Sequence, residues 1–184
     1  MTRILSRRSF MPLVAATLLS PAAIVAARAQ GAAWEMYRRD DLGFEVDMPG
    51  KPEMRTEESA DRNDPWIKTI NAGVDYEATL FSANYQEFQR PLTLAAESAA
   101  QRQVAQFLRA RVVRETTFTM NGIDALEIVK DGDSTQNILR IVMVANRRIM
   151  VSATGGRSIH ASATVQRFLG SFKLLPGQDE HNPA

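Results

Sequence analysis

The stretch Asn137–Ala145 constrains the fold most, because it is apolar at nearly every position rather than at alternate ones. Successive side chains of a strand point to opposite faces of a sheet, so a strand with this sequence has to be covered on both faces. The segment Val74–Tyr85 also carries apolar side chains on both faces. We therefore expect an α+β fold in which helices cover both faces of a sheet, an α/β/α sandwich.

The other strand candidates alternate in polarity or end at turn residues. Phe44, Val46 and Met48 alternate with two acids, which is the period of a half-buried strand. Asn121-Gly122 and Asp131-Gly132 are typical of tight hairpin turns, and a further turn is expected at residues 71–73. We expect an antiparallel sheet of about six or seven strands, drawn from residues 34–37, 44–48, 53–59, 66–70, 74–85, 113–120, 123–130, 137–145, 149–154 and 172–174.

Two segments have the period of helices. Residues 92–112 contain no glycine or proline, Thr93 is a suitable N-cap, and the expected buried stripe is Ala100, Val104, Phe107, Leu108 and Val112. A second helix is expected over residues 159–169, capped by Ser158 and followed by Gly170 at its C-terminal end.

The first 29 residues are typical of an export signal. They hold four arginines and no acid. A basic start is followed by an alanine-rich apolar run and then by Ala27 and Ala29 at the two positions that a signal peptidase reads. Arg7, Arg8 and Phe10 resemble the twin-arginine export motif, which implies a bacterial protein that folds before it crosses into the periplasm. An ordinary secretory signal or an uncleaved anchor is the alternative. The apolar run is shorter than the roughly 20 residues of a spanning helix.

The mature chain is expected to be a single α+β domain over residues 30–175, with a flexible tail over residues 176–184. Without the leader the formal charge of +1 becomes −3, which favours neither nucleic acid nor anionic lipid as a partner. The sequence has no cysteine, so disulfides and lipid attachment to a cysteine are excluded, and the core has to form by packing alone. No stable membrane anchor is expected after cleavage.

Two segments near the ends of the mature chain have a recognisable pattern. Tyr37–Pro52 reads YRRDDLGFEVDMPGKP, and Arg167–Leu174 reads RFLGSFKL. Together they resemble the PsbP-like domain family. The resemblance extends over most of the mature chain, and glycine and aromatic positions carry it. It implies an α/β/α sandwich and roles such as adaptor, assembly factor or extrinsic subunit. It implies no shared catalytic set of residues.

Searches for reactive residue patterns give no catalytic, cofactor or metal site. The mature chain has only His160 and His181, without the paired spacing that zinc requires. It contains no Gly-x-Ser-x-Gly nucleophile elbow and no phosphate-binding loop. The aromatic residue most suited to recognition is Trp66, with Asp64 beside it. The alternative for Trp66 is a core anchor of its hairpin.

These observations favour an exported, periplasmic, non-catalytic protein that binds an unknown protein or small ligand, in envelope assembly or maintenance. The alternative is a periplasmic hydrolase whose carboxylate or Ser/Thr site forms only in three dimensions. A deep polar pocket with several carboxylates would favour the hydrolase. A flat apolar patch would favour an adaptor, and an apolar cavity between helix and sheet would favour a small lipophilic ligand.

Replacing both Arg7 and Arg8 by lysine is expected to block export, because the twin-arginine route reads the adjacent arginine pair. Cell fractionation and immunoblotting should find the double variant retained in the cytoplasm, while an Arg3→Lys control reaches the periplasm. Unchanged export of the double variant would show that the leader uses the ordinary secretory route.

Overall fold

The structure, a computed structural model, describes residues 33–61 and 63–176. The expected signal peptide lies outside the described residues, as do residues 177–184 of the expected tail. The targeting and cleavage assignments therefore stay predictions. They concern Arg7, Arg8, Phe10, Ala27 and Ala29.

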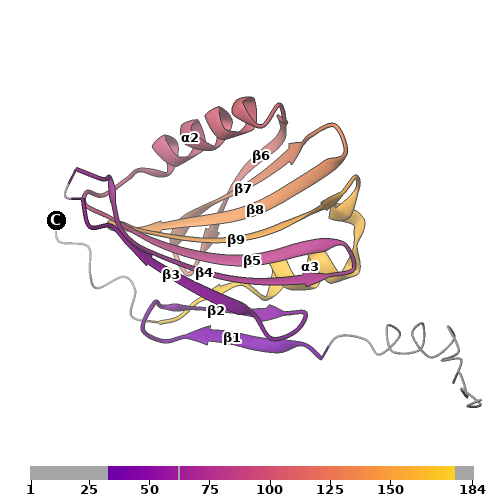
Figure 1. Cartoon of the computed structure of the whole chain (residues 1–184), viewed down its shortest axis with the longest axis horizontal. Coiled ribbons are helices and arrows are strands. Elements are labelled where there is room, and N and C mark those ends of the chain that lie inside the picture. Colours follow the sequence, from indigo (N-terminus) through magenta and orange to yellow (C-terminus); the bar gives the residue numbers. More distant parts are fainter. Residues whose placement is uncertain (1–32, 62, 177–184) are drawn as a thin grey trace, which may run out of the picture. The chain divides into compact units, whose positions relative to one another are not determined.

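A seven-stranded sheet forms the centre of the fold (Figure 1). All its neighbouring strands are antiparallel, and β3 and β6 are its edges. The strands in spatial order are β3 (Glu53–Glu58), β4 (Trp66–Tyr76), β5 (Thr79–Phe88), β9 (Arg147–Gly156), β8 (Thr135–Val144), β7 (Ile123–Asp131) and β6 (Arg111–Met120).

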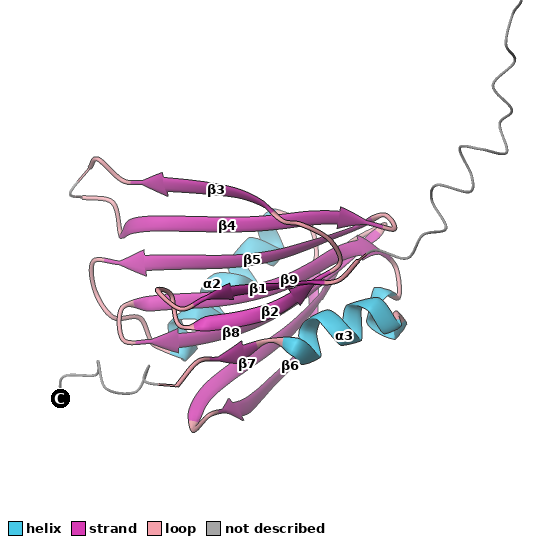
Figure 2. Cartoon of the chain, turned by 90° about the horizontal axis from the view of Figure 1, so that it is seen from below, coloured by secondary structure: helices cyan, strands magenta, loops and turns pink. Residues whose placement is uncertain are grey.

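The two faces of this sheet are covered differently (Figure 2). One face carries helix α2 (Leu94–Phe107). The other carries helix α3 (Ala163–Ser171) and a small antiparallel sheet of β1 (Glu35–Arg39), β2 (Phe44–Met48) and β10 (Lys173–Leu174). A 3-10 turn, η1 (Ile159–Ala161), precedes α3. No helix among the described residues is long and apolar enough to cross a membrane.

The expected α+β fold is confirmed, but the strands expected at residues 34–37, 44–48 and 172–174 form a separate small sheet rather than part of the main one. The continuous apolar run was the decisive signal, because β8 is central and covered on both sides. Ile138 and Val142 belong to the core cluster on the α3 side. Leu139 and Ile141 belong to a second cluster on the opposite face, where Leu94 of α2 packs.

Aromatic residues of the two family-like segments hold the α3 side together. Phe168 packs edge-on against Phe81 with ring centroids 5.1 Å apart, and Phe172 packs against Phe44 at 6.4 Å. The Ser171 hydroxyl accepts a hydrogen bond from the Asp47 backbone N–H at 2.9 Å. The two segments that carry the family resemblance lie at opposite ends of the domain sequence. They pack on each other in the structure.

The turn expected at residues 71–73 is wrong. β4 runs through them without a break, and the chain reverses at Glu77 and Ala78, both in the left-handed region with φ of 48° and 58°. Asn71 and Gly73 looked like turn residues, but the Asn71 side-chain oxygen accepts a hydrogen bond from the Asn84 amide across the strands at 2.6 Å. A side-chain pair of this kind stabilises a strand position that propensity alone disfavours.

Three other local expectations are corrected. Gly132 lies in a short loop closed by its own N–H to the Thr135 carbonyl, rather than in a two-residue turn. Ser158 has a left-handed backbone and makes no capping bond, so the α-helix begins later, at Ala163. Gly170 lies inside α3 rather than after it. The Asn121-Gly122 turn is as expected, with both residues at positive φ.

Replacing Gly155 by alanine is expected to destabilise the domain by about 1–3 kcal/mol, the usual cost of overpacking. A Cβ atom there would lie 2.8 Å from the Thr79 hydroxyl and 2.9 Å from the Ile159 Cγ2. Gly156→Ala is the matched control, because its Cβ would meet nothing within 4 Å. Urea unfolding should separate the two variants. Equal stabilities would contradict the packing at Gly155.

Candidate functional site

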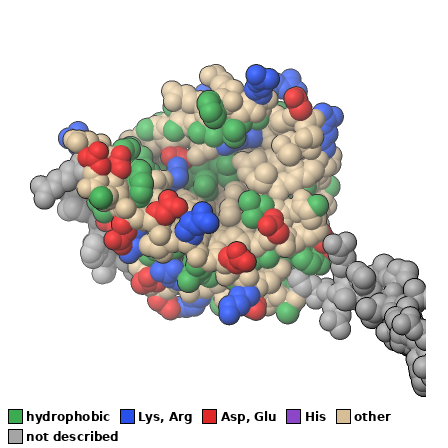
Figure 3. Space-filling view, in the orientation of Figure 1, with side chains coloured by type: hydrophobic (Ala, Val, Ile, Leu, Met, Phe, Trp, Pro, Cys, Tyr) green, Lys and Arg blue, Asp and Glu red, His purple; other side chains and the backbone are tan. Residues whose placement is uncertain are grey.

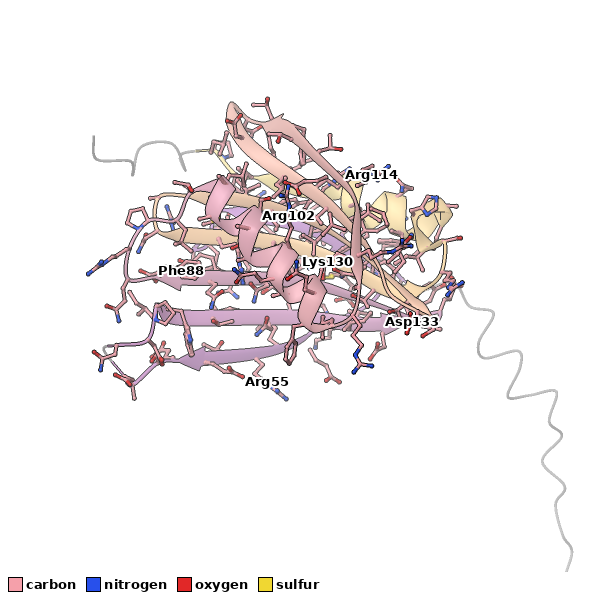
Figure 4. The ribbon with its side chains drawn as sticks, turned by 90° about the horizontal axis from the view of Figure 1, so that it is seen from above. Arg55, Phe88, Arg102, Arg114, Lys130 and Asp133 are labelled. Carbon is pink, nitrogen blue, oxygen red and sulfur yellow. The ribbon has the colours of Figure 1, made fainter. Side chains whose placement is uncertain are left out.

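Helix α2 covers only part of its side of the sheet. It packs on β6 and β7, and Figure 4 shows it crossing the sheet obliquely, with the edge strand β3 clear of it. Small polar side chains of β4, β5 and β9 lie on this side of the sheet, where Asn84 and Ser152 are buried and Asn71 and Ser82 are partly exposed. Asn84 bonds to Asn71, and the Ser82 and Ser152 hydroxyls lie 2.8 Å apart. We call this surface of β4, β5 and β9 the open face.

The rotation of α2 contradicts the expected burial stripe. Glu97, Gln101 and Ala105 are the buried residues of the helix. Val104 is 44% exposed and Phe107 86% exposed, although both were expected in the core. Positions i, i+4 and i+7 share one flank of a helix, so Ala100, Val104 and Phe107 line the flank opposite the one tied to β6.

The helix expected over residues 92–112 is also too long at its C-terminal end. Its last helical residue is Phe107, and Arg109 has a left-handed φ of 55°. The chain then enters β6 at Arg111, so Val112 is a strand residue rather than part of a helical stripe. The N-cap is as expected, because the Thr93 hydroxyl accepts the Ala96 N–H at 3.1 Å.

A buried polar network lies beneath α2. Arg148 of β9 donates to the Glu97 carboxylate at 2.8 Å and to the Gln86 amide oxygen at 2.6 Å. The Gln101 amide donates to the same Glu97 oxygen at 2.7 Å, and Lys130 of β7 donates to the Gln101 oxygen at 2.6 Å. Glu97 is only 2% exposed, so its charge is compensated inside the protein rather than by water.

Burial lowers the pKa of Lys130 below its ordinary value of 10.5, since the charged ammonium loses its hydration. The Glu97 carboxylate opposes this shift of the pKa, and the Arg148 guanidinium adds to it. Figure 4 labels Lys130 beside α2. The buried network thus holds one carboxylate against two basic groups.

A second set of bonds ties the other flank of α2 to the edge strand β6. The Ser98 hydroxyl donates to the Glu115 carboxylate at 2.6 Å, and Arg102 donates to its other oxygen at 2.8 Å. These two bonds lower the pKa of Glu115. They hold α2 toward β6 and therefore away from the open face.

A cavity of about 670 Å³ opens between the N-terminal half of α2 and the adjoining strand ends. Figure 3 shows this side of the molecule hollowed beside α2, with hydrophobic side chains in the hollow. We call it the α2 cavity. Its apolar lining is Pro65, Phe88, Leu92 and Ala100, and its polar lining is Asn63, Asp64, Gln89, Arg90, Glu97 and Arg148.

The α2 cavity is not built like a hydrolytic site. Among the residues that the structure describes, Glu97 is the one buried carboxylate, and its oxygen is held by Arg148 and Gln101. No group of three His, Cys, Asp or Glu that could hold a metal occurs within that part of the chain. A mixed lining of apolar walls and a few polar groups is typical of ligand-binding cavities.

The two residues expected in recognition lie on this side. Asp64 lines the α2 cavity, and its carboxylate accepts a hydrogen bond from Ser59. Trp66 is half-buried and lines a neighbouring hollow of about 360 Å³ together with Ile67 and Gln89. Both assignments stay predictions. Sequence reasoning missed Glu97 and Gln101, because charged and amide side chains at helical spacing are typical of a solvated face. It missed Lys130 and Arg148, because they lie on strands far from α2 in the sequence.

No protein-family model matches the sequence, and no curated protein matches it. The structure is similar to the solution structure of cyanobacterial PsbP (CyanoP) from Synechocystis sp. PCC 6803, with a TM-score of 0.53. The match covers 78% of this chain and 93% of that chain at 10% sequence identity, so it establishes the fold. The PsbP-like fold expected from the two sequence segments is confirmed.

The Lys130→Met variant provides a pH test of the network. Between the lowered pKa of the folded state and 10.5 in the unfolded chain, the unfolded state binds more protons, so the free energy of unfolding rises with pH. Methionine removes this contribution. Urea unfolding from about pH 7 to pH 10.5 should therefore show the wild type gaining stability relative to the variant. A constant or shrinking difference would contradict the buried position of Lys130.

Proposed function

We propose that this chain is an exported periplasmic protein whose non-catalytic PsbP-like domain binds a partner or ligand at the α2 cavity and the adjoining flank of α2. The observation that carries the proposal is the exposure of Val104 and Phe107 on the same flank of α2 as Ala100, which lines the cavity together with Arg148. Large apolar side chains gathered next to a cavity mark a contact surface more often than an inert one.

Export is supported by the leader sequence. Arg7, Arg8 and Phe10 resemble a twin-arginine motif, and Ala27 and Ala29 fit a cleavage site. Cleavage there leaves a domain of charge −3, which suits neither nucleic acid nor an anionic membrane surface. The partner is therefore a protein or a small ligand in the periplasm.

The binding role is better supported than the hydrolase alternative. A hydrolase of the kind considered needs a carboxylate or hydroxyl free to act as an acid, a base or a nucleophile. Glu97 instead neutralises Arg148 and accepts from Gln101. A deep polar pocket would favour a hydrolase, a flat apolar patch an adaptor, and an apolar cavity between helix and sheet a small lipophilic ligand. The α2 cavity comes closest to the third.

The proposal predicts that a photo-crosslinking amino acid in place of Phe107 captures a discrete molecule in living cells. The same amino acid in place of Met36 is the matched control, since Met36 is also exposed, at 63%, but lies on β1. Mass spectrometry of the protein isolated from the periplasm should find an adduct, of protein or small-molecule mass, at position 107 and not at position 36.

Absence of any adduct at position 107, or equal adducts at both positions, would contradict a binding site beside α2. Recovery of the protein from the cytoplasm alone would contradict its export. A turnover of a hydrolysable substrate that Glu97→Gln abolishes would favour the enzyme instead.

A further inference from the structure

We propose that the α2 cavity binds a lipophilic anion, with one acidic head group at Arg148 and an acyl chain along the apolar flank of α2. The proposal rests on the binding function proposed above and names the class of ligand. The two parts of the ligand, head and chain, correspond to two separate features of the site.

Charge balance favours an acidic head group. Arg148 and Lys130 face one buried carboxylate, Glu97, so a protonated network keeps one positive charge without a counter-ion. The Nε–H of Arg148 is buried and has no hydrogen-bond partner among the described residues. Buried charged groups without compensation are costly, so an anion that reaches Arg148 is stabilised there.

The arginine is also well placed for such a head group. It lines the α2 cavity, and its guanidinium lies 5.7 Å from the ring centroid of Phe88. Bonds to Glu97 and Gln86 fix its position before any ligand arrives. Charge-assisted bonds from a fixed guanidinium to a carboxylate or phosphate are among the strong ones in proteins.

The other charged residues of the cavity do not cancel this preference. Arg90 lines the same cavity and adds a second basic group. Asp64 is the remaining acid, and its carboxylate already accepts a hydrogen bond from Ser59. A cationic ligand would meet two arginines, and to reach Glu97 it would have to displace the Glu97–Arg148 pair.

The apolar part of the ligand has a matching wall. Pro65, Phe88, Leu92 and Ala100 line the cavity, and Val104 and Phe107 continue the flank of α2 beyond it. The volume of about 670 Å³ lies within the usual range of ligand cavities. An acyl chain along this flank would cover apolar surface that the domain itself leaves exposed, which is the source of its affinity.

The decisive experiment is isothermal titration of the purified mature protein with four probes of equal chain length, each kept below its micelle concentration. The probes are dodecanoate, dodecyl phosphate, dodecanol and dodecyltrimethylammonium. We expect the acids to bind at least about tenfold more tightly than the alcohol, as one charge-assisted hydrogen bond would give. We expect no binding of the cation.

The two acidic probes distinguish the natural sources of the ligand. Tighter binding of dodecanoate identifies a free fatty acid, and tighter binding of dodecyl phosphate identifies a phosphate head group. Binding of the alcohol as tight as that of the acids would overturn the proposal, and so would the absence of binding by either acid.

Variants locate the site. Arg148→Gln is expected to abolish the preference for acid over alcohol. Because Arg148 is largely buried, Val104→Asp serves as a second variant that changes an exposed side chain and leaves the core intact. We expect it to weaken dodecanoate binding at least about tenfold. The new carboxylate has the same sign of charge as the ligand and would lie against the apolar chain of the ligand. Met36→Asp is the matched control, and an equal loss in this variant would overturn the location.

Failure of this proposal can be told apart from failure of the proposed function. If crosslinking at position 107 captures a protein or another molecule while no acidic probe binds, the ligand class is wrong and the binding site remains. If position 107 captures nothing and no probe binds, both are wrong.

Discussion

The Glu97–Arg148 ion pair is the interaction on which the arrangement of this domain depends. Glu97 enters the interior from α2, and Arg148 meets it from β9 at 2.8 Å. Breaking a buried pair leaves a buried charge, so α2 cannot rotate without a large cost in free energy. The pair therefore turns the polar face of α2 inward. Its apolar flank, with Val104 and Phe107, is left exposed instead of filling the core.

Much of the fold could be predicted from the sequence, because it follows from local patterns. The apolar run within Thr135–Val144 required cover on both faces, and the Asn121-Gly122 turn needed only the positive φ that these residues supply. The hairpin between β4 and β5 could not be placed, since Glu77 and Ala78 adopt left-handed φ without a favourable propensity. The strands of the small sheet were expected, but their separation from the main sheet was missed, because β10 pairs with β2 from the far end of the domain.

The site was less predictable, for one physical reason. Periodicity shows which helix residues share a face, but an apolar stripe was assumed to face the core. The polar stripe of Glu97 and Gln101 is equally periodic, and its burial depends on Lys130 and Arg148, which are distant in sequence. Asp64 was singled out beforehand and does line the α2 cavity. The signal that could have been used is Glu97, Gln101 and Ala105 at four-residue intervals.

The orientation of α2 is the central claim, and thiol labelling of single-cysteine variants tests it most directly. The chain has no cysteine of its own, so each signal comes from one introduced position. Cysteines at Val104 and Phe107 should be modified rapidly in the folded protein. Those at Gln101 and Ala105 should react at least roughly tenfold more slowly, because they need local opening. Fast labelling at Gln101 and Ala105 with protection at Val104 and Phe107 would contradict the account.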